Sequence, residues 1–372
     1  MRAPLAPLGL ALLLAVVVSD DLSGQIQGPQ AANPNSNANV ELCGVNSGWI
    51  DPLGLLLQVN RDKQGRAGSW LPPNVEGWVN KSDPFNSASL NDLMAGLQLG
   101  NYRYPGGSIG NSWDWKANTM SPLANDSFHT TIAKVLATGV FPPAALGVAR
   151  FDAMAQRAGA KNILALDVST AGPDPSIPAL VVKEIGLERA SRFEIGNEVY
   201  DPTQGPQPGG YSTAQEYLAD TAALVKAVRD VGATAGVNVG PCPFFYPEGS
   251  PCWGGPDGRY HQWNRNISNA CQATSGGACP FDAVIAHNYV TDVTVIQPYA
   301  KQGEDVMLSV FLTVPQVTID FGAATMERDF ADGIRLWITE YNTMFAQNWG
   351  GKADETAPEA AAFLNRCVGY VP

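Results

Sequence analysis

Basic residues are scarce in this chain of 372 residues, which has 23 Lys and Arg against 35 Asp and Glu and a formal net charge of −12. A nucleic-acid partner requires a basic surface, so the composition argues against one. After Val18 the chain also lacks an apolar run long enough to cross a membrane. Since 45% of the residues are apolar, the chain can nevertheless bury a sizeable core.

Two familiar binding motifs are absent as well. No Gly-rich loop follows the first predicted strand, which argues against a dinucleotide-binding fold. Four of the six Cys residues fall in one Gly- and Pro-rich stretch, 241–280, without the close CxxC pairs of a zinc module. We therefore interpret this stretch as a Cys-rich insertion held by local disulfides, and we expect neither metal nor cofactor. The four residues are Cys242, Cys252, Cys271 and Cys279; Cys43 and Cys367 remain for a long-range pair.

The N-terminus has the layout of a secretory signal, with a basic residue, an apolar run from Leu8 to Val18 and a polar end. We interpret residues 1–24 as a signal peptide, because the apolar run is short for a membrane anchor. Residues 25–39, rich in Gln, Asn, Pro and Ala, are predicted to be a flexible leader. These features predict a secreted protein that is not held by a membrane after cleavage. Three Asn-X-Ser sequons, which fit a secreted glycoprotein, begin at Asn80, Asn125 and Asn266.

From residue 40 onward, short apolar runs of the β type alternate with segments of helical periodicity. The predicted strands are Val40–Asn46, Asn101–Gly107, Asn162–Val168, Arg192–Glu198, Thr234–Gly240, Phe281–Tyr289 and Arg335–Asn342. The predicted helices are 89–99, 128–139, 151–160, 177–190, 213–232 and 325–333. This alternation is typical of an α/β fold with a parallel sheet, and seven or more units favour a closed TIM-type (β/α) barrel over residues 40–372.

The predicted barrel is one strand short. After the seventh predicted strand only a helical stretch follows, so no residues remain for an eighth. A barrel left open exposes unpaired strand edges, which soluble proteins avoid. We therefore interpret the chain as a barrel truncated before the eighth strand, that is, a C-terminally incomplete catalytic domain. The sequence gives no indication of an oligomeric state.

Two acidic residues stand near the ends of predicted strands: Glu198 in the fourth and Glu340 in the seventh. In a β/α barrel the carboxyl ends of the strands form the active site. Two carboxylates from different strands that face one cleft, one protonated and one ionised, are what hydrolysis of a glycosidic bond requires. For either residue taken alone, a charge that meets solvent at a strand end is the alternative interpretation.

Strand alternation predicts which side chains share a face with these carboxylates. Glu340 has the parity of Ile338, so this face is expected to point toward the barrel axis. By the same rule Trp337 is expected to be buried against the helices. Glu194 lies below Glu198 on the inward face and is predicted to form an ion pair with an interior Arg.

Four short segments resemble one family of enzymes. "FEIGNEVY" (193–200) and "LWITEYN" (336–342) resemble the acid/base and nucleophile segments of the retaining glycoside hydrolase clan whose two Glu residues end the fourth and seventh barrel strands. "NYRYPGGSIGNSWDW" (101–115) is similar to the second-strand motif of the α-L-arabinofuranosidases of this clan. "AHNYV" (286–290) is similar to the His-x-Tyr of the sixth strand. The nearest resemblance is to the α-L-arabinofuranosidases, and a heparanase-like or β-glucuronidase-like family is second.

The resemblance implies a role for each matching residue. Glu198 becomes the general acid/base and Glu340 the nucleophile, with the two carboxyl groups about 5 to 5.5 Å apart. Asn197 is implied to bind the sugar 2-hydroxyl. Tyr289 is implied to donate a hydrogen bond to Glu340, and Arg103 to keep that carboxylate ionised through its positive charge.

Three further residues of these segments are candidates for substrate binding. His287 shares a strand face with Tyr289 and is expected either to join this network or to be a structural hydrogen-bonding residue. Trp113 and Trp115 are candidates for stacking against a sugar, because the faces of sugars pack on flat aromatic rings.

Three functions follow from these expectations. The first is a secreted retaining glycosidase that acts on a carbohydrate substrate, an oligo- or polysaccharide, in the manner of an arabinofuranosidase. The second is a heparanase-like or β-glucuronidase-like hydrolase that acts on uronic-acid glycans, for which extra Lys or Arg should line the cleft. The third, of another class, is an inactive carbohydrate-binding barrel or a truncated remnant, against which the presence of both Glu198 and Glu340 counts.

Overall fold

The computed structural model divides the chain into two units, Met1–Asn37 and Ala38–Pro372, and every described residue lies in the second. The described residues are 40–41, 85, 101–120, 143–169, 172–202, 204, 206, 210–240, 258–273, 279–291, 321–330 and 333–344; the side chains of 40–41, 108, 288–291 and 341–344 are excepted. The predicted signal peptide, the predicted leader and the predicted helices 89–99 and 128–139 lie outside these residues.

Seven parallel strands form one sheet in the described residues. They are β1 (Val40–Glu41), β2 (Asn101–Tyr104), β5 (Lys161–Leu166), β6 (Arg192–Ile195), β7 (Thr234–Asn238), β8 (Ala283–Thr291) and β9 (Arg335–Met344). Their order across the sheet is β1-β9-β8-β7-β6-β5-β2, and each neighbouring pair is parallel. All seven predicted strands are therefore confirmed, most with bounds a few residues shorter or longer than expected.

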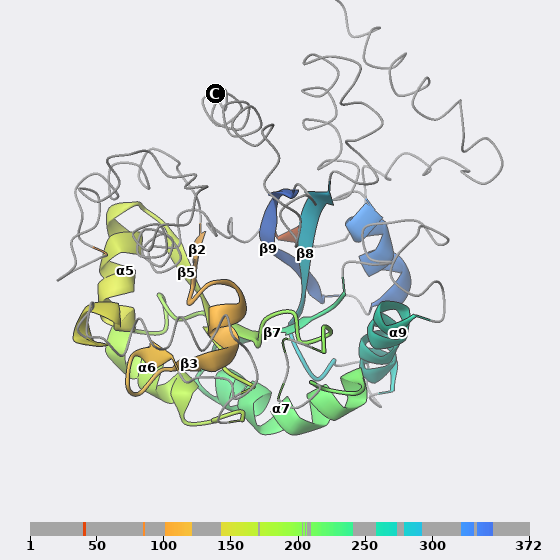
Figure 1. Ribbon diagram of the computed structural model, residues 1–372, viewed down its shortest axis with the longest axis horizontal. Coiled ribbons are helices and arrows are strands. Elements are labelled where there is room, and N and C mark those ends of the chain that lie inside the picture. The colour runs from red at the N-terminus through yellow and green to blue at the C-terminus, as the bar shows by residue number, and fades with distance from the viewer. Residues whose placement is uncertain are drawn as a thin grey trace, which may run out of the picture. The chain divides into compact units, whose positions relative to one another are not determined.

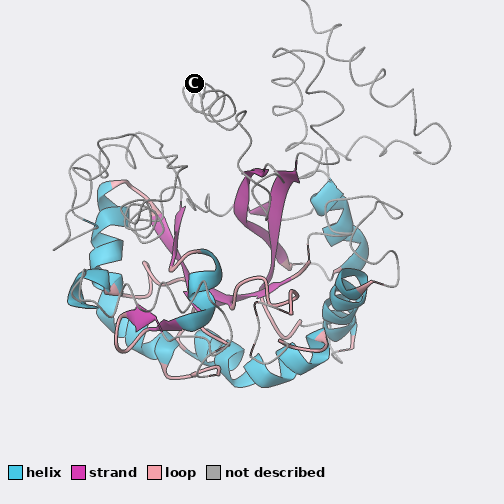
Figure 2. Ribbon diagram, in the orientation of Figure 1, coloured by secondary structure: helices cyan, strands magenta, loops and turns pink. Residues whose placement is uncertain are grey.

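The sheet is curled, and the helices lie on its outer side (Figures 1 and 2). The helices are α5 (Val148–Arg157), α6 (Ile177–Ile185), α7 (Ala214–Asp230), α9 (Arg259–Gln272) and a further helix at 321–329. Within the described residues the sheet has two edge strands, β1 and β2. It thus corresponds to part of a TIM-type barrel, while the closed barrel and the missing eighth strand remain predictions.

Helix α7 illustrates why these segments are helical. The side chain of Thr213, the N-cap, accepts a hydrogen bond from the Glu216 amide, while the Glu216 carboxylate accepts one from the Ser212 amide just before the cap. The apolar side of α7 packs on the sheet and the hydroxyl of Tyr217 donates to the carbonyl of Ile195, 2.6 Å away. The helix therefore ties its own first turns to the end of β6.

Each face of the sheet has its own apolar cluster. The larger one lies between the strands and the helices and includes Leu336 and Ile338. The smaller one holds strand residues only and lies on the opposite, concave face; its members are Ile163, Ala283, Ile285 and Trp337. The prediction that Trp337 is buried against the helices is therefore wrong. A Cβ atom on Gly236 would lie 2.8 Å from the Trp337 ring, so the missing side chain of Gly236 makes room for the indole.

The stretch predicted to be a Cys-rich insertion contains a regular helix. α9 covers residues 259–272 of it and follows β7, as expected of the next strand–helix unit. The indole N–H of Trp263 donates to the carbonyl of Asn238, 2.9 Å away, which fixes α9 against the end of β7. One disulfide of the expected local kind is present, between Cys271 and Cys279. The sequon at Asn266 lies within α9.

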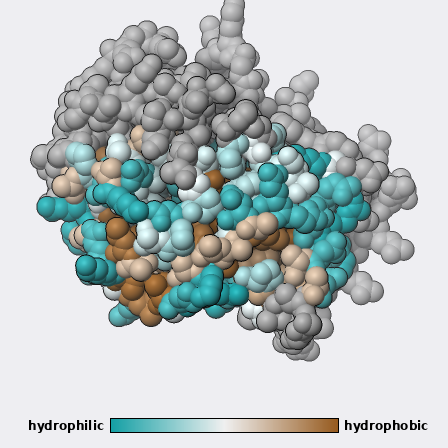
Figure 3. Space-filling view, turned by 90° about the horizontal axis from the view of Figure 1, so that it is seen from below, coloured by the Kyte–Doolittle hydropathy of each residue, from teal (hydrophilic) through white to brown (hydrophobic). Residues whose placement is uncertain are grey.

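The remaining described elements are short. They are η3 (Gly107–Ser112), η4 (Pro143–Leu146) and the two-stranded hairpin of β3 (Trp113–Asp114) and β4 (Thr119–Met120). No helix of the described part is both long and apolar enough to span a membrane. The face in Figure 3 carries hydrophilic and hydrophobic residues together. Among the described residues, Leu187 is the one large hydrophobic side chain that is exposed, at 41%.

Candidate active site

Glu198 stands on a strained turn directly after β6. Gly196 has φ of 74°, and Glu198 has φ of 47°, a left-handed conformation that residues with a side chain seldom adopt. A Cβ atom on Gly196 would lie 2.7 Å from side-chain atoms of both Val168 and Val199. The turn therefore requires glycine at 196, and it holds Glu198 in a conformation that surrounding contacts must enforce.

Two asparagine side chains enforce this turn. The Asn238 amide group donates to the carbonyls of Ile195 and Gly196, and its oxygen accepts from the Glu198 amide, 2.9 Å away. Asn111 of η3 binds the peptide of Asn197 from the other side, with its oxygen 2.7 Å from the amide nitrogen and its nitrogen 2.6 Å from the carbonyl oxygen. Each buried peptide group of the turn thus has a partner, which makes the strained conformation stable.

Glu340 reaches the same face from β9 by a different route. The pairing of β8 with β9 runs from Ala286 opposite Ile338 to His287 opposite Glu340, so Thr339 is an extra residue, a β-bulge. The bulge reverses the alternation, so Glu340 lies on the concave face with Trp337 rather than with Ile338. The predicted location of Glu340 is correct, whereas the parity from which it was predicted is not.

Arg103 connects the two halves of the site. Its Nε and Nη2 atoms donate to the carboxylate of Glu194, at 2.5 and 2.7 Å. Its Nη1 atom donates to Oε1 of Glu340 at 2.5 Å, and Nη2 also donates to Oδ1 of Asn197 at 2.8 Å. Burial lowers the pKa of Arg103, but Glu194 and Glu340 outweigh this effect and raise it. The predicted ion pair of Glu194 with an interior Arg is confirmed.

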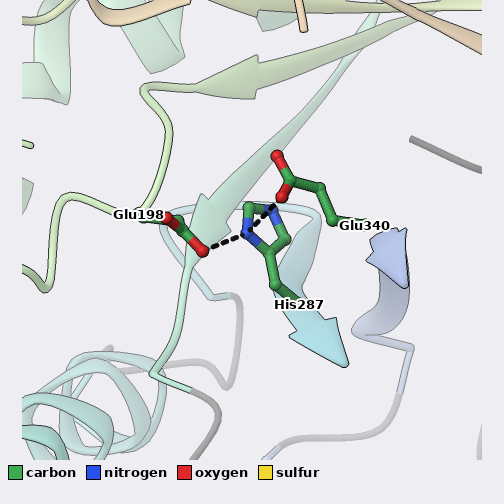
Figure 4. Close-up of side chains that lie close together, drawn as sticks. All are labelled: Glu198, His287 and Glu340. Carbon is green, nitrogen blue, oxygen red and sulfur yellow. Dashed lines mark hydrogen bonds and ion pairs between the residues drawn. The ribbon is translucent and has the colours of Figure 1, made fainter. Parts of the chain in front are cut away.

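His287 lies between the two carboxylates that the sequence singled out (Figure 4). Its Nδ1 atom is 2.8 Å from Oε1 of Glu198 and 3.5 Å from Oε2 of Glu340, and its Nε2 atom is 3.1 Å from the Thr339 hydroxyl. Burial lowers the pKa of His287, but the carboxylates around it, chiefly Glu340 with Glu194 and Glu198, raise it to about 10. The ring is therefore a cation at neutral pH and donates from both nitrogens.

The carboxylates of Glu198 and Glu340 converge. One oxygen of each and one ring nitrogen of His287 all lie within 4.8 Å of one another. The two carboxylates differ in access, because the side chain of Glu198 is 26% exposed and that of Glu340 only 5%. The site therefore pairs a buried carboxylate with one that solvent reaches.

The same three side chains are also of the types that bind metals. Their surroundings oppose this use, because Arg103 already occupies Oε1 of Glu340 and the His287 ring is protonated. A metal ligand must be a neutral imidazole, and a bound cation would face the guanidinium. Without a metal ion, the three carboxylates of Glu194, Glu198 and Glu340 face two organic cations, Arg103 and His287.

Asn197 presents an unused hydrogen-bond donor. The side chain is buried, and because Oδ1 accepts from Arg103, the Nδ2 group points elsewhere. In the described residues Nδ2 has no hydrogen-bond partner. An unpaired buried amide group is costly, so this donor is suited to an oxygen supplied by a ligand.

The other predicted substrate-binding residues fare differently. The indoles of Trp113 and Trp115 lie in the larger apolar cluster, 1% and 4% exposed, with their rings edge-on to Tyr104. Rings this deeply buried have no free face for a sugar, so their location does not support the stacking role. The backbone of Tyr289 pairs with Asn342, but its side chain lies outside the described part of the structure.

Two residues of the site were missed in the sequence. Asn111 lies inside the segment "NYRYPGGSIGNSWDW", and the only signal for it was its place in that segment. Asn238 lies two residues before the end of the predicted fifth strand, at the edge where polar residues are worth inspecting in a β/α fold. The sequence does not indicate that either Asn holds a turn, because Asn is common in loops of all kinds.

Comparisons with known proteins give structural likeness only. No protein-family model matches the chain, and no curated protein matches it significantly. A family 51 α-L-arabinofuranosidase from Bifidobacterium longum is similar with a TM-score of 0.46 and 17% identity, over 77% of this chain and 57% of that one. A GH51 arabinofuranosidase from Xanthomonas axonopodis pv. citri gives 0.43 and 14%, over 78% and 60%. An α-L-arabinofuranosidase from Thermotoga maritima gives 0.40 and 16%, over 71% and 51%. The chain spans less than two thirds of the length of each of these three structures.

Proposed function

We propose that the protein is a retaining glycoside hydrolase, secreted and arabinofuranosidase-like, that cleaves oligo- or polysaccharides by double displacement. The observation that carries the proposal is the convergence of Glu198 and Glu340, with oxygens within 4.8 Å of each other. Retaining enzymes hold their two carboxyl groups about 5 to 5.5 Å apart, while inverting enzymes need roughly 6.5 to 9.5 Å to admit a water molecule. The short separation supports the retaining class.

Glu340 is suited to the role of the nucleophile. It is buried, and Arg103 holds its Oε1 atom by an ion pair of 2.5 Å. The guanidinium favours the ionised carboxylate and fixes its direction. In the first step Glu340 attacks the anomeric carbon, a glycosyl–enzyme bond forms and the bond to the leaving oxygen breaks.

Glu198 is suited to the role of the acid and base, because solvent and a leaving group reach a side chain that is 26% exposed. It gives its proton to the leaving oxygen in the first step, so the leaving group departs as a neutral alcohol. In the second step the Glu198 carboxylate takes a proton from water, and that water displaces Glu340 from the sugar.

Asn197 supplies a contact to the sugar. Its unpaired Nδ2 group is adjacent in sequence to Glu198 and is held by Arg103, which also holds Glu340. A hydroxyl beside the anomeric carbon would complete this donor's hydrogen bonding, and such a bond strengthens as charge develops at the sugar ring. The apolar floor beneath the site, formed by Trp337 and its neighbours, keeps the reacting groups away from bulk water on that side.

A uronic-acid substrate has less support. A sugar carboxylate needs a free cation, and the two cations that contact the catalytic carboxylates are both engaged. Arg103 donates to Glu194, Glu340 and Asn197, and His287 binds Glu198. We therefore place a neutral sugar first and keep the glucuronide as a test substrate.

The decisive experiment is a panel of 4-nitrophenyl glycosides with the full chain: α-L-arabinofuranoside, β-xyloside, β-glucoside and β-glucuronide. Turnover of one of them is expected, and Glu340→Gln should lower it by about 10⁴-fold or more, because no covalent intermediate can form. The matched control is Glu327→Gln on the helix at 321–329, which should leave turnover unchanged. A folded wild-type protein that turns over none of the four would overturn the proposal in favour of an inactive barrel.

Azide separates the two carboxylate roles. With the turned-over sugar on a good leaving group, azide should rescue Glu198→Ala and give a glycosyl azide of retained configuration. With Glu340→Ala it should give the inverted azide, because azide then replaces the nucleophile itself. The same configuration from both variants, or rescue of neither, would contradict the assignment.

A further inference from the structure

Tyr200 is a buried residue of the site to which the proposed mechanism gives no role. It follows Glu198 by two positions, is 5% exposed, and its hydroxyl lies 3.1 Å from Oε1 of Glu198. That hydroxyl has no other hydrogen-bond partner among the described residues. Burial, with the negative charge of Glu198 next, raises the pKa of Tyr200 well above its usual value, so the hydroxyl keeps its proton. It therefore donates to Glu198.

The two donors to Glu198 meet at one oxygen. Oε1 accepts from the Tyr200 hydroxyl at 3.1 Å and from Nδ1 of His287 at 2.8 Å. Oε2 forms no hydrogen bond with any described residue. A carboxylic proton on Oε1 would be directed at one of these two donors, whereas a proton on Oε2 meets neither.

Helix α9 holds Tyr200 in this position. Nε of Arg259 donates to the carbonyl of Tyr200 at 2.5 Å, and the guanidinium lies over the ring of Trp263, 5.5 Å from its centre. The ring of Tyr260 packs edge-on against the Tyr200 ring, with centres 5.3 Å apart. The backbone and the ring of Tyr200 are thus both fixed by the first turns of α9, so the hydroxyl has little freedom to leave Glu198.

We propose that Tyr200 is a positioning residue which, together with His287, occupies Oε1 of Glu198 so that Oε2 carries the proton to the leaving group. This inference rests on the proposed function. The proposal has a specific chemical consequence. Loss of the Tyr200 hydroxyl impairs proton delivery by Glu198 but does not affect the attack by Glu340. Substrates that need a proton on the leaving oxygen therefore suffer, and those with a very acidic leaving group do not.

The test compares two aryl glycosides of the sugar that the enzyme turns over, one with phenol and one with 2,4-dinitrophenol as leaving group. For Tyr200→Phe we expect kcat/KM to fall about 10- to 100-fold on the phenyl glycoside and less than about threefold on the dinitrophenyl glycoside. Arg259→Lys should show the same preference more weakly. An equal loss on both substrates would assign Tyr200 a merely structural role and overturn the proposal.

Tyr211→Phe is the matched control. Tyr211 is another buried tyrosine, and its hydroxyl binds the Asp220 carboxylate at 2.7 Å rather than Glu198. The same atom is removed, with a comparable cost in packing and hydrogen bonding. We expect its kcat/KM to change by the same factor on the two substrates.

A double-mutant cycle tests the contact without any activity. The thermal midpoint is measured for the wild type, Tyr200→Phe, Glu198→Ala and the double variant. The two shifts should fail to add by about 1 to 2 °C, since one hydrogen bond is lost in either single variant. Additive shifts would overturn the proposal. An inactive wild type with non-additive shifts would instead refute the proposed function and, with it, the role in proton delivery, while the contact itself would stand.

Discussion

The two carboxylates of the site are held in contrasting ways. Glu198 stands on a left-handed turn whose peptide groups are bound by the side chains of Asn111 and Asn238. Glu340 stands within strand β9, directly after the bulge at Thr339, and is bound through its own carboxylate by Arg103. The first residue is positioned through its backbone, the second through its charge.

This difference matches what each residue is proposed to do. A group that gives and takes a proton changes charge twice in a cycle, and a backbone anchor holds it equally well in both states. A nucleophile must stay ionised until it attacks, and a fixed cation favours that state. The strained turn at Glu198 and the buried ion pair of Glu340 should therefore respond differently to mutation.

The largest effect is expected for Arg103→Met. It removes the guanidinium that pairs with the buried carboxylates of Glu194 and Glu340, and breaking a buried ion pair on one side costs about 3 to 5 kcal/mol. Urea unfolding measures the loss. Adding Glu194→Gln should recover part of it, because one uncompensated charge is removed. The exposed pair is the control: Lys226→Ala, next to Asp230, should change the free energy of unfolding by less than about 0.5 kcal/mol. Equal costs for the two variants would contradict the role of burial.

The backbone side of the comparison is tested by Gly196→Ala. The new methyl group would meet Val168 and Val199 at 2.7 Å in a backbone conformation that already disfavours a side chain, so we expect a loss of about 2 to 4 kcal/mol. Gly186→Ala is the control, since Gly186 has φ of 82° but no atom within 4 Å of the new methyl group. It should cost only about 1 kcal/mol. Similar losses at the two positions in urea unfolding would show that packing around the turn is looser than described.

His287 contacts both Glu198 and Glu340, and its contribution to the stability of the fold depends on pH. Its pKa is raised from 6.5 in the unfolded chain to about 10 in the folded one, so it stabilises the protein fully below about pH 6.5. This contribution shrinks as the pH rises and is lost above about pH 10. The wild type should therefore lose stability relative to His287→Gln between pH 6.5 and 10, by up to about 1.4 kcal/mol per pH unit. A constant difference across unfolding curves at pH 6, 8 and 10 would contradict a protonated ring.

The smallest effect is expected when Gly and Ala variants are compared at Glu198 and at Glu340, where backbone strain should give differences in stability of opposite sign. Glu198→Gly and Glu198→Ala both remove the carboxylate, but only alanine is strained at φ of 47°, so the glycine variant should be more stable by about 1 kcal/mol. At Glu340, in the extended strand β9, the order should reverse, with alanine more stable by about 0.5 to 1 kcal/mol. The same order at both positions in thermal or urea unfolding would mean that strain does not distinguish them.

The sequence predicted the strands well, because a buried parallel strand leaves a run of apolar residues that few other structures explain. It also predicted that Glu198 and Glu340 come together and that Glu194 forms an interior ion pair, while the catalytic roles of the two residues stay predictions. These residues are charged side chains beside apolar runs, and that contrast is visible without a structure.

The sequence did not reveal the bulge at Thr339. A bulge is a matter of pairing between two strands, and β9 alone reads as a regular alternation. Below the bulge the predicted faces were exchanged, so Ile338 was placed toward the barrel axis and Trp337 toward the helices. The prediction for Glu340 was not affected, because the extra residue Thr339 lies between Ile338 and Glu340 and restores the face. The location of the carboxylate was thus predicted correctly for a reason that the structure does not support.

The contacts of Trp113, Trp115 and Asn111 could not be predicted for a related reason. All three lie in the segment after β2, which ends at Tyr104, and nothing local determines which of them turns into the core and which turns toward Asn197. Likewise α9 was hidden by the Gly, Pro and Cys residues around it, which suggested a loop. Tertiary packing decided each case.

The Trp337 indole and the bare backbone of Gly236 have a consequence for redesign of the site. A Cβ atom on Gly236 would meet both the Trp337 ring and the side chain of Ile285, so the indole occupies volume that a side chain at 236 would otherwise take. A smaller residue at 337 would lower this floor and admit a bulkier ligand, while a side chain at 236 would refill the vacated volume from the other strand. Side-chain volume lost at position 337 can therefore be compensated at position 236. The two positions should be varied together to make the site deeper or shallower.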